Sequence, residues 1–302
     1  MVIKKTIGEK IFTVINIILL VALSVTCLYP MLHVLFSSVS DPIELMKHQG
    51  IMLRPLGFTI NGYKLVFQNP NISNGYLNTI FYVGVGTLIN IFMTSIGAYV
   101  LSRKNVLWKN LMTFIITFTM FFGGGLIPFY LLVKKLGMMD TRWAIIIPGA
   151  ISTYNLFVMR TSFAGIPVSL EESAKIDGAN DFTVLFRIIL PLSKAVLAVM
   201  ALFYAVGHWN AWFNAMIFLR NRKLYPLQVI LREILISNDM QTMGNVESLV
   251  EGSVEANADV VYFSRILVQY CTIVVATAPI LFLYPFIQKY FVKGVMIGSL
   301  KE

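Results

Sequence analysis

The side chains that could do chemistry in this sequence form two groups, one around Glu172 and one around His208. The first group lies in the stretch SLEESAKIDGANDFTVLFRIILPLSK, Ser169 to Lys194, which carries charges of both signs between two long uncharged segments. The second group is set in an apolar segment and consists of His208, Trp209, Asn210, Trp212 and Asn214. Aromatic rings can lie against a sugar ring and amides can bond its hydroxyls, so the second group has the chemistry of carbohydrate recognition.

Covalent and metal chemistry have little support in the sequence. The histidines His33, His48 and His208 are scattered and lack the H-E-x-x-H spacing of a metalloprotease. Cys27 and Cys271 show neither metal-site nor disulfide spacing. The chain also lacks the G-x-x-x-x-G-K-[ST] loop that cradles nucleotide phosphates. We therefore expect a protein that is not an enzyme, that binds no metal or cofactor itself, and that does not hydrolyse ATP.

The composition predicts an all-α membrane protein. The mean hydropathy is +0.74 and 13% of residues are charged, about half of the roughly 25% usual in soluble domains. Six uncharged apolar segments are long enough to cross a bilayer as helices. They are Ile11 to Phe36, Leu77 to Leu101, Leu111 to Val133, Trp143 to Met159, Ala195 to Leu219, and Ile266 to Gln288.

The charges flanking these segments predict the orientation. Lys4, Lys5 and Lys10 precede the first segment, which is too long for a signal peptide and has no cleavage site, so we expect an uncleaved helix. The positive-inside rule then places both termini in the cytoplasm and explains the net charge of +9 without a nucleic-acid partner. The expected organisation is a first helix in 1–36, an extracytoplasmic loop in 37–76, a five-helix core in 77–292 with a polar loop in 164–191, and a cytoplasmic tail in 293–302.

The polar loop is expected to begin with a short helix and a glycine turn. Ser169 and Glu172 have the S-x-x-E spacing of a capping box, which predicts a helix start. Gly178 suits the left-handed position that ends a helix, and Asn180 or Asp181 can cap the next one.

The second helix of this loop is expected to be amphipathic and to end at Pro191. Its apolar face would be formed by Phe182, Leu185, Phe186 and Ile189, which have helical spacing. Such an element can dock in a groove on another protein or lie on the bilayer surface, and periodicity does not separate the two.

Other polar residues inside the expected spans are candidates for a solute path because burying an unpaired polar group in hydrocarbon is costly. They are Tyr154, Asn155, Asn78 and Asn90, besides the group around His208. Hydrogen bonds between helices are the expected role more often than solute contact. Gly123 to Gly125, followed by Pro128, should loosen the third helix, either as a hinge or, as we favour, at a tight helix crossing.

The spacing of the polar loop resembles a known signature. Glu172, Ser173, Ala174, Gly178, Ile188, Leu190 and Pro191 fit the pattern E-A-A-x3-G-x9-I-x-L-P of ABC importer permeases, with Ser173 in place of the second letter. The stretches YPMLHVLFSSVSDP, FTMFFGGGLIPFYLLV, HWNAWFNA and YPFIQKYFVKGVMIGSLKE resemble carbohydrate permeases of the maltose-importer class. They are most similar to the subgroup that imports fragments of alginate or pectin.

This resemblance implies a type I importer fold of six transmembrane helices in a bacterial cytoplasmic membrane. It places Glu172, Ser173, Ala174 and Asp177 in a coupling helix docked on a cytoplasmic ATPase, Gly178 at its turn, and Ile188, Leu190 and Pro191 where the chain returns to the bilayer. The implied partners are a second homologous permease, two copies of an ATPase that bind ATP and magnesium, an extracytoplasmic solute-binding protein, and an oligosaccharide, which the partner permease can hold.

Two alternatives to oligosaccharide import remain. The same coupling signature occurs in permeases for other solutes. A secondary transporter is less favoured, because the six segments contain no Asp, Glu, Lys or Arg and no clear internal repeat.

Overall fold

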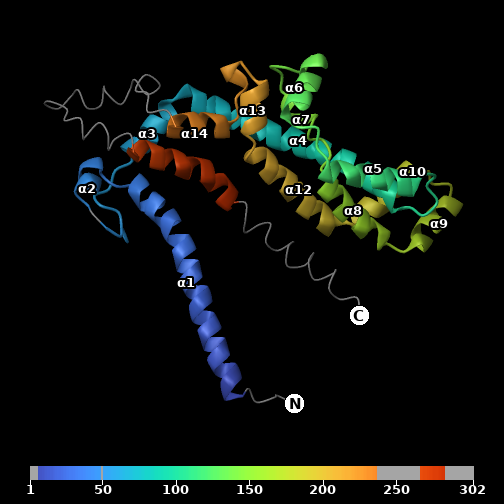
Figure 1. Ribbon diagram of the computed structural model, residues 1–302, viewed down its shortest axis with the longest axis horizontal. Coiled ribbons are helices and arrows are strands. Elements are labelled where there is room, and N and C mark those ends of the chain that lie inside the picture. Colours follow the sequence, from blue (N-terminus) through green and yellow to red (C-terminus); the bar gives the residue numbers. More distant parts are fainter. Residues whose placement is uncertain (1–5, 49, 237–265, 283–302) are drawn as a thin grey trace. The chain divides into compact units, whose positions relative to one another are not determined.

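The computed structural model describes residues 6–48, 50–236 and 266–282, which form helices and turns with no strand among them (Figure 1). The chain divides into two compact units. One comprises Met1–Asn69 with Ile234–Thr277, and the other comprises Pro70–Glu233 with Ala278–Glu302. The prediction of an all-α fold is confirmed for the described residues.

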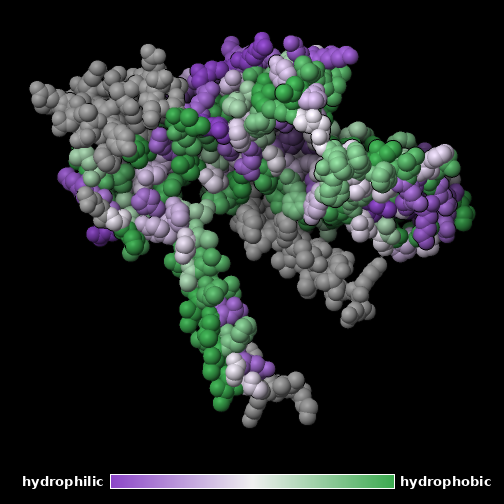
Figure 2. All heavy atoms as spheres, in the orientation of Figure 1, coloured by the Kyte–Doolittle hydropathy of each residue, from purple (hydrophilic) through white to green (hydrophobic). Residues whose placement is uncertain are grey.

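The first unit contains α1 (Ile7–Ser38), α2 (Pro42–Lys47), α3 (Asn61–Gln68) and most of an apolar helix over Ile266–Phe282. α1 begins at a capping box formed by Thr6 and Glu9. Most of its apolar side chains are exposed, and those on the face seen in Figure 2 form a continuous green strip along the helix. A helix that is apolar on every side is suited to lipid contact.

The second unit is built around α4 (Pro70–Ser102), which packs along α8 (Thr153–Ala164) and α12 (Lys194–Trp209). Short helices complete it. They are α5 (Lys109–Phe121), α6 (Leu126–Lys135), α7 (Trp143–Ile146), α9 (Val168–Ile176), α10 (Asp181–Val184), a π-helical turn (Leu185–Ile189), α11 (Leu190–Leu192), α13 (Phe213–Phe218), a 3-10 turn (Arg222–Leu224) and α14 (Leu227–Ile236), whose last residues belong to the first unit.

Two of the described helices, α1 and α4, are long and apolar enough to cross a membrane. The number rises to four if two bent pairs each count as one span. These pairs are α5 with α6, bent by 115°, and Asp181–Leu192 with α12, bent by 88°. The expected sixth span continues past Phe282 into residues that lie outside the described part, so the count of six remains a prediction. The expected tail, 293–302, also lies outside the described residues.

The third expected span is not a continuous helix. It breaks between α5 and α6, where Gly125 has φ +84°. A side chain added at Gly123, Gly124 or Gly125 would meet nothing within 4 Å. No described residue packs against these glycines, so the expected tight crossing is not formed within the described part of the chain and stays a prediction for contacts outside it.

The fourth and fifth expected spans are also interrupted. The fourth breaks at Pro148 and Gly149 between α7 and α8, since proline cannot donate the backbone hydrogen bond that a helix needs. The fifth ends as α12 at Trp209, and the chain resumes as the short helix α13. The breaks lie next to the polar residues that the sequence marked as candidates.

Candidate functional site

The first helix of the polar loop begins earlier than expected. α9 starts at Val168, its N-cap is Pro167, and no side chain caps it. Ser169 therefore lies inside the helix and the expected capping box is not formed. Pro167, with ψ 129°, stands just outside the helix.

The turn that follows α9 has the predicted form. Gly178 has φ +83°, the left-handed conformation in which glycine carries no steric penalty. The Gly178 N–H donates to the Lys175 carbonyl at 3.0 Å and the Ala179 N–H to the Ala174 carbonyl at 2.9 Å. These are the two bonds of a Schellman motif, so the glycine ends the helix as expected.

The second helix keeps its predicted cap but not its predicted face. The Asn180 side chain accepts a hydrogen bond from the Thr183 N–H at 2.8 Å. Leu185 and Ile189 are buried, whereas the Phe182 and Phe186 side chains stay exposed. The π-helical turn holds more residues per turn than an α-helix, so the α-helical spacing that predicted the face does not hold through it.

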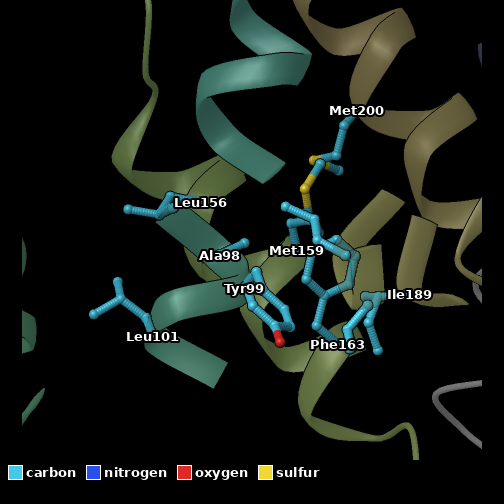
Figure 3. Close-up of a cluster of buried hydrophobic side chains, with 10 residues drawn as sticks. Ala98, Tyr99, Leu101, Leu156, Met159, Phe163, Ile189 and Met200 are labelled. Carbon is cyan, nitrogen blue, oxygen red and sulfur yellow. The ribbon is translucent and has the colours of Figure 1, made fainter. Parts of the chain in front are cut away.

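Buried apolar packing joins this second helix to the membrane helices (Figure 3). Ile189 lies in one cluster with Tyr99 of α4, Phe163 of α8 and Met200 of α12. Leu190 and Ile188 are half-buried, and Pro191 is exposed one residue before the helix ends at Leu192. A displacement of this segment must therefore move side chains of α4, α8 and α12, because such interiors are close-packed.

An ionic cluster joins the first helix of the loop to the end of α4. Glu171 is buried, and its carboxylate accepts hydrogen bonds from Arg103 and from Lys175, the latter at 3.0 Å. The Tyr99 hydroxyl donates to the same carboxylate at 3.3 Å. Burial raises the pKa of the Glu171 carboxyl, but the Lys175 hydrogen bond and the Arg103 charge outweigh it, so the pKa lies below its usual value.

Neither Glu171 nor Arg103 was identified from the sequence. A usable signal was present, because two adjacent glutamates on one short helix point about 100° apart. One of them can therefore face the protein while the other faces solvent.

The outer face of α9 carries the residues of the coupling signature. Glu172, Ser173, Asp177 and Gly178 are exposed, while Ala174 is half-buried against the apolar cluster. Ile176 is 86% exposed, and Val168 and Leu170 of the same helix are exposed apolar side chains as well. Figure 2 shows hydrophilic side chains gathered at the end of the unit that carries α9 and α10. We call this exposed surface, Glu172 to Gly178, the α9 face.

The second candidate group divides into residues that join helices and residues that are exposed. The His208 ring nitrogen Nε2 lies 2.7 Å from Oδ1 of Asn90, and the Asn90 amide donates to the Gly149 carbonyl at 2.6 Å. The ring lies against Gly86, where a Cβ atom would be 2.5 Å from Nε2. His208 and Asn90 thus hold together α4, α12 and the break between α7 and α8.

A second bridge at the same break was missed by sequence reasoning. The Tyr204 hydroxyl lies 2.7 Å from the Thr94 hydroxyl and accepts a hydrogen bond from the Ser152 N–H at 3.0 Å. The sequence offered one indication of this bridge, because Tyr204 and Thr94 are polar residues inside two of the expected spans.

The tryptophans of the second group are placed differently. Trp209 is buried edge-on to Tyr76, and its Nε1 finds no hydrogen-bond partner in the described residues. Trp212 lies under the guanidinium of Arg232, 3.8 Å from the ring centroid. The remaining candidates are Asn155, which is buried, and Tyr154, Asn210 and Asn214, which are exposed.

Comparison with known proteins supplies the wider context. Residues 86–297 match the family described as binding-protein-dependent transport system inner membrane component. The chain is 38% identical to the polygalacturonan/rhamnogalacturonan transport system permease protein YtcP of Bacillus subtilis, over 97% of this chain and 99% of that one. It is 39% identical to protein LplC of the same organism, over 97% of this chain and 95% of that one.

A solved structure agrees with these relatives. The chain resembles a chain of a bacterial ABC transporter involved in the import of the acidic polysaccharide alginate, with a TM-score of 0.85 and 30% identity over 95% of this chain and 99% of that one. Both the fold and the sequence therefore match along almost the whole length. The chain belongs to the family of binding-protein-dependent transport system inner membrane components.

Proposed function

We propose that this chain is one of two homologous permease subunits of an ATP-driven oligosaccharide importer, and that α9 is the helix through which it couples to the ATPase. One observation carries the proposal. The α9 face is exposed and the adjoining Phe182 and Ile176 are exposed apolar residues, while the other side of the loop is fixed to α4, α8 and α12. A short helix that presents exposed apolar side chains beside polar ones can dock in a groove of another protein.

Membership of the family makes the chain a transport component and not an enzyme. The family also implies a solute-binding protein and an ATPase as partners. We infer that ATP and magnesium bind in the ATPase, because this sequence contains no phosphate loop. We further propose two ATPase copies, six spans, and cytoplasmic termini, with the α9 face on the cytoplasmic side.

The cargo is proposed from the relatives. YtcP belongs to a transport system for polygalacturonan and rhamnogalacturonan, and the solved structure is of a transporter involved in the import of the acidic polysaccharide alginate. We propose an oligosaccharide derived from such a polymer. His208 is occupied in joining helices, so Trp209, Asn210 and Asn214 are better candidates for lining the path, together with Tyr154.

The mechanism that follows is alternating access. Closure of the ATPase dimer on ATP displaces α9, and the tightly packed segment around Ile189 passes this movement to α4, α8 and α12. The helices then open the path toward the binding protein, and ATP hydrolysis resets the complex.

The test uses the whole complex reconstituted in liposomes with its second permease, ATPase and binding protein. ATP hydrolysis and uptake are measured with galacturonate, alginate and neutral oligosaccharides and with a peptide. Gly178→Val strains the turn by about 1–2 kcal/mol without a clash, since nothing lies within 4 Å of its Cβ position. Gly178→Asn is the matched control, because asparagine tolerates left-handed backbone.

We expect ATP-driven uptake of one class of carbohydrate. Gly178→Val should reduce this uptake, and Gly178→Asn should largely keep it. Uptake of the peptide and of no carbohydrate would contradict the proposed oligosaccharide cargo but would leave the proposed coupling through α9 intact. Uptake by this chain alone, driven by an ion gradient and insensitive to both variants, would contradict the proposed function.

A further inference from the structure

Glu171 stands apart from every other charged residue of the described chain. It is the only buried Asp, Glu, Lys or Arg among the described residues, with 6% of its surface exposed. It is also the only buried residue of α9. Burying a carboxylate is costly unless it is paired, so its partners hold it in place.

Those partners belong to membrane helices as well as to the loop. Arg103, directly after α4, donates to one Glu171 oxygen, and its second terminal nitrogen donates to the Phe163 carbonyl of α8 at 3.4 Å. Tyr99, in the last turn of α4, donates to the other Glu171 oxygen. A single carboxylate of α9 is therefore connected to the ends of both α4 and α8.

Apolar packing does not replace this connection. A cavity of about 910 Å³ lies beside the ion pair, lined among others by Arg103, Lys104, Lys109 and Glu171. Ala174 is the α9 side chain that packs on the apolar cluster, and it is small and only half-buried. The ionic contacts of Glu171 thus attach α9 directly to the end of α4 and, through Arg103, to α8, in addition to the packing around Ile189.

The neighbouring glutamate faces solvent. Glu172 is exposed on the α9 face, about 100° around the helix from Glu171. The two carboxylates consequently have different surroundings, one toward the docking surface and one toward the membrane helices.

We propose that Glu171, through Arg103, is a positioning residue that passes the displacement of α9 to α4 and α8. This inference rests on the proposed function. Glu172 and the rest of the α9 face serve docking, whereas Glu171 converts docking into movement. Loss of the Glu171 charge should uncouple hydrolysis from transport while the ATPase stays bound.

The experiment compares Glu171→Gln, Glu171→Asp and wild type in the reconstituted complex. Three quantities are measured: the ATPase retained on purification, the rate of ATP hydrolysis, and the sugar imported per ATP hydrolysed. Glu44→Gln is the control, because Glu44 is an exposed glutamate whose partner, Lys47, lies on its own helix.

We expect Glu171→Gln to retain the ATPase and continue hydrolysis, with sugar per ATP lower by at least about fivefold, the smaller end of usual coupling effects. Glu171→Asp keeps the charge and should recover part of this ratio, and Glu44→Gln should equal wild type. If Glu171→Gln does not assemble, Arg103→Lys serves instead, since it keeps a cation but loses the second contact to Phe163, and it should also lower the ratio.

An unchanged ratio in the variant that assembles would overturn the inference. So would a parallel fall of uptake and hydrolysis caused by loss of the ATPase, because Glu171 would then act in docking or folding only. If wild type itself shows no ATP-dependent uptake, the proposed function fails. That outcome is distinct from the failure of the Glu171 inference, which requires a wild-type complex that imports sugar.

Discussion

The contact between Gly86 and His208 allows a stringent test of how α4 and α12 are held together. A Cβ atom at position 86 would lie 2.5 Å from Nε2 and 2.7 Å from Cε1 of the ring. This is roughly 1 Å short of the 3.5–4.0 Å that packed heavy atoms prefer. In Gly86→Ala the ring must therefore shift, and the 2.7 Å contact with Asn90 must lengthen or break.

The expected cost has two parts. Overpacking a tight contact costs about 1–3 kcal/mol, and the lost hydrogen bond contributes about 0.5–1.5 kcal/mol. Gly86→Ala should thus lower the free energy of unfolding by about 1.5–4.5 kcal/mol. Gly84→Ala is the matched control on the same helix, because nothing lies within 4 Å of its Cβ position and it shares the helix-propensity gain of alanine.

The assay is reversible unfolding of the purified chain in mixed micelles by titration with a denaturing detergent. His208→Ala provides a double-mutant cycle, since removing the ring removes the clash. The Gly86→Ala penalty should then largely disappear. A penalty no greater than that of Gly84→Ala, or one that persists in the His208→Ala background, would refute the contact.

Two further predictions concern buried polar groups. Tyr204→Phe removes the hydroxyl that contacts Thr94 and Ser152, so it should lower the free energy of unfolding by about 1–3 kcal/mol. Tyr154→Phe, at an exposed site, should change the free energy of unfolding by less than about 0.5 kcal/mol. If Tyr204→Phe and Tyr154→Phe had equal effects in detergent unfolding, the bridge through Tyr204 would be contradicted. Because the folded-state pKa of Glu171 is below its ordinary 4.5, its ionic stabilisation is complete above that pH and is lost as the pH falls through the folded value. The melting-temperature difference between wild type and Glu171→Gln should therefore be full at neutral pH and shrink below about pH 4.5, whereas a difference that grows on acidification would reverse the assigned sign.

Local features of the polar loop, 164–191, could be predicted from the sequence. Gly178 is the left-handed end of α9 and Asn180 caps the next helix, because both depend on neighbouring backbone groups only. α9 starts at Val168, before the Ser169 that the S-x-x-E spacing marks as its cap. The apolar face was misassigned because nothing in an α-helical pattern announces a π turn.

The expected spans show the same limit on a larger scale. Composition is enough to recognise a helical membrane protein, since few alternatives can bury so apolar a chain. The breaks at Gly125 and Pro148 were signalled by residue type, but whether such a residue bends, interrupts or merely loosens a helix depends on what packs beside it. Open space at Gly125 and the bonds of Asn90 near Pro148 are properties of the folded chain.

The sequence by itself determined the class of the protein, the place of its polar loop and the glycine on which that loop turns, because hydrophobicity and short-range spacing act within a few residues. Only the tertiary structure decided that Glu171 faces inward and Glu172 outward, and that His208 joins Asn90 rather than standing free in a path. These roles depend on partners far away in the chain, and a side chain's function is set by which distant group its fold brings within hydrogen-bonding distance.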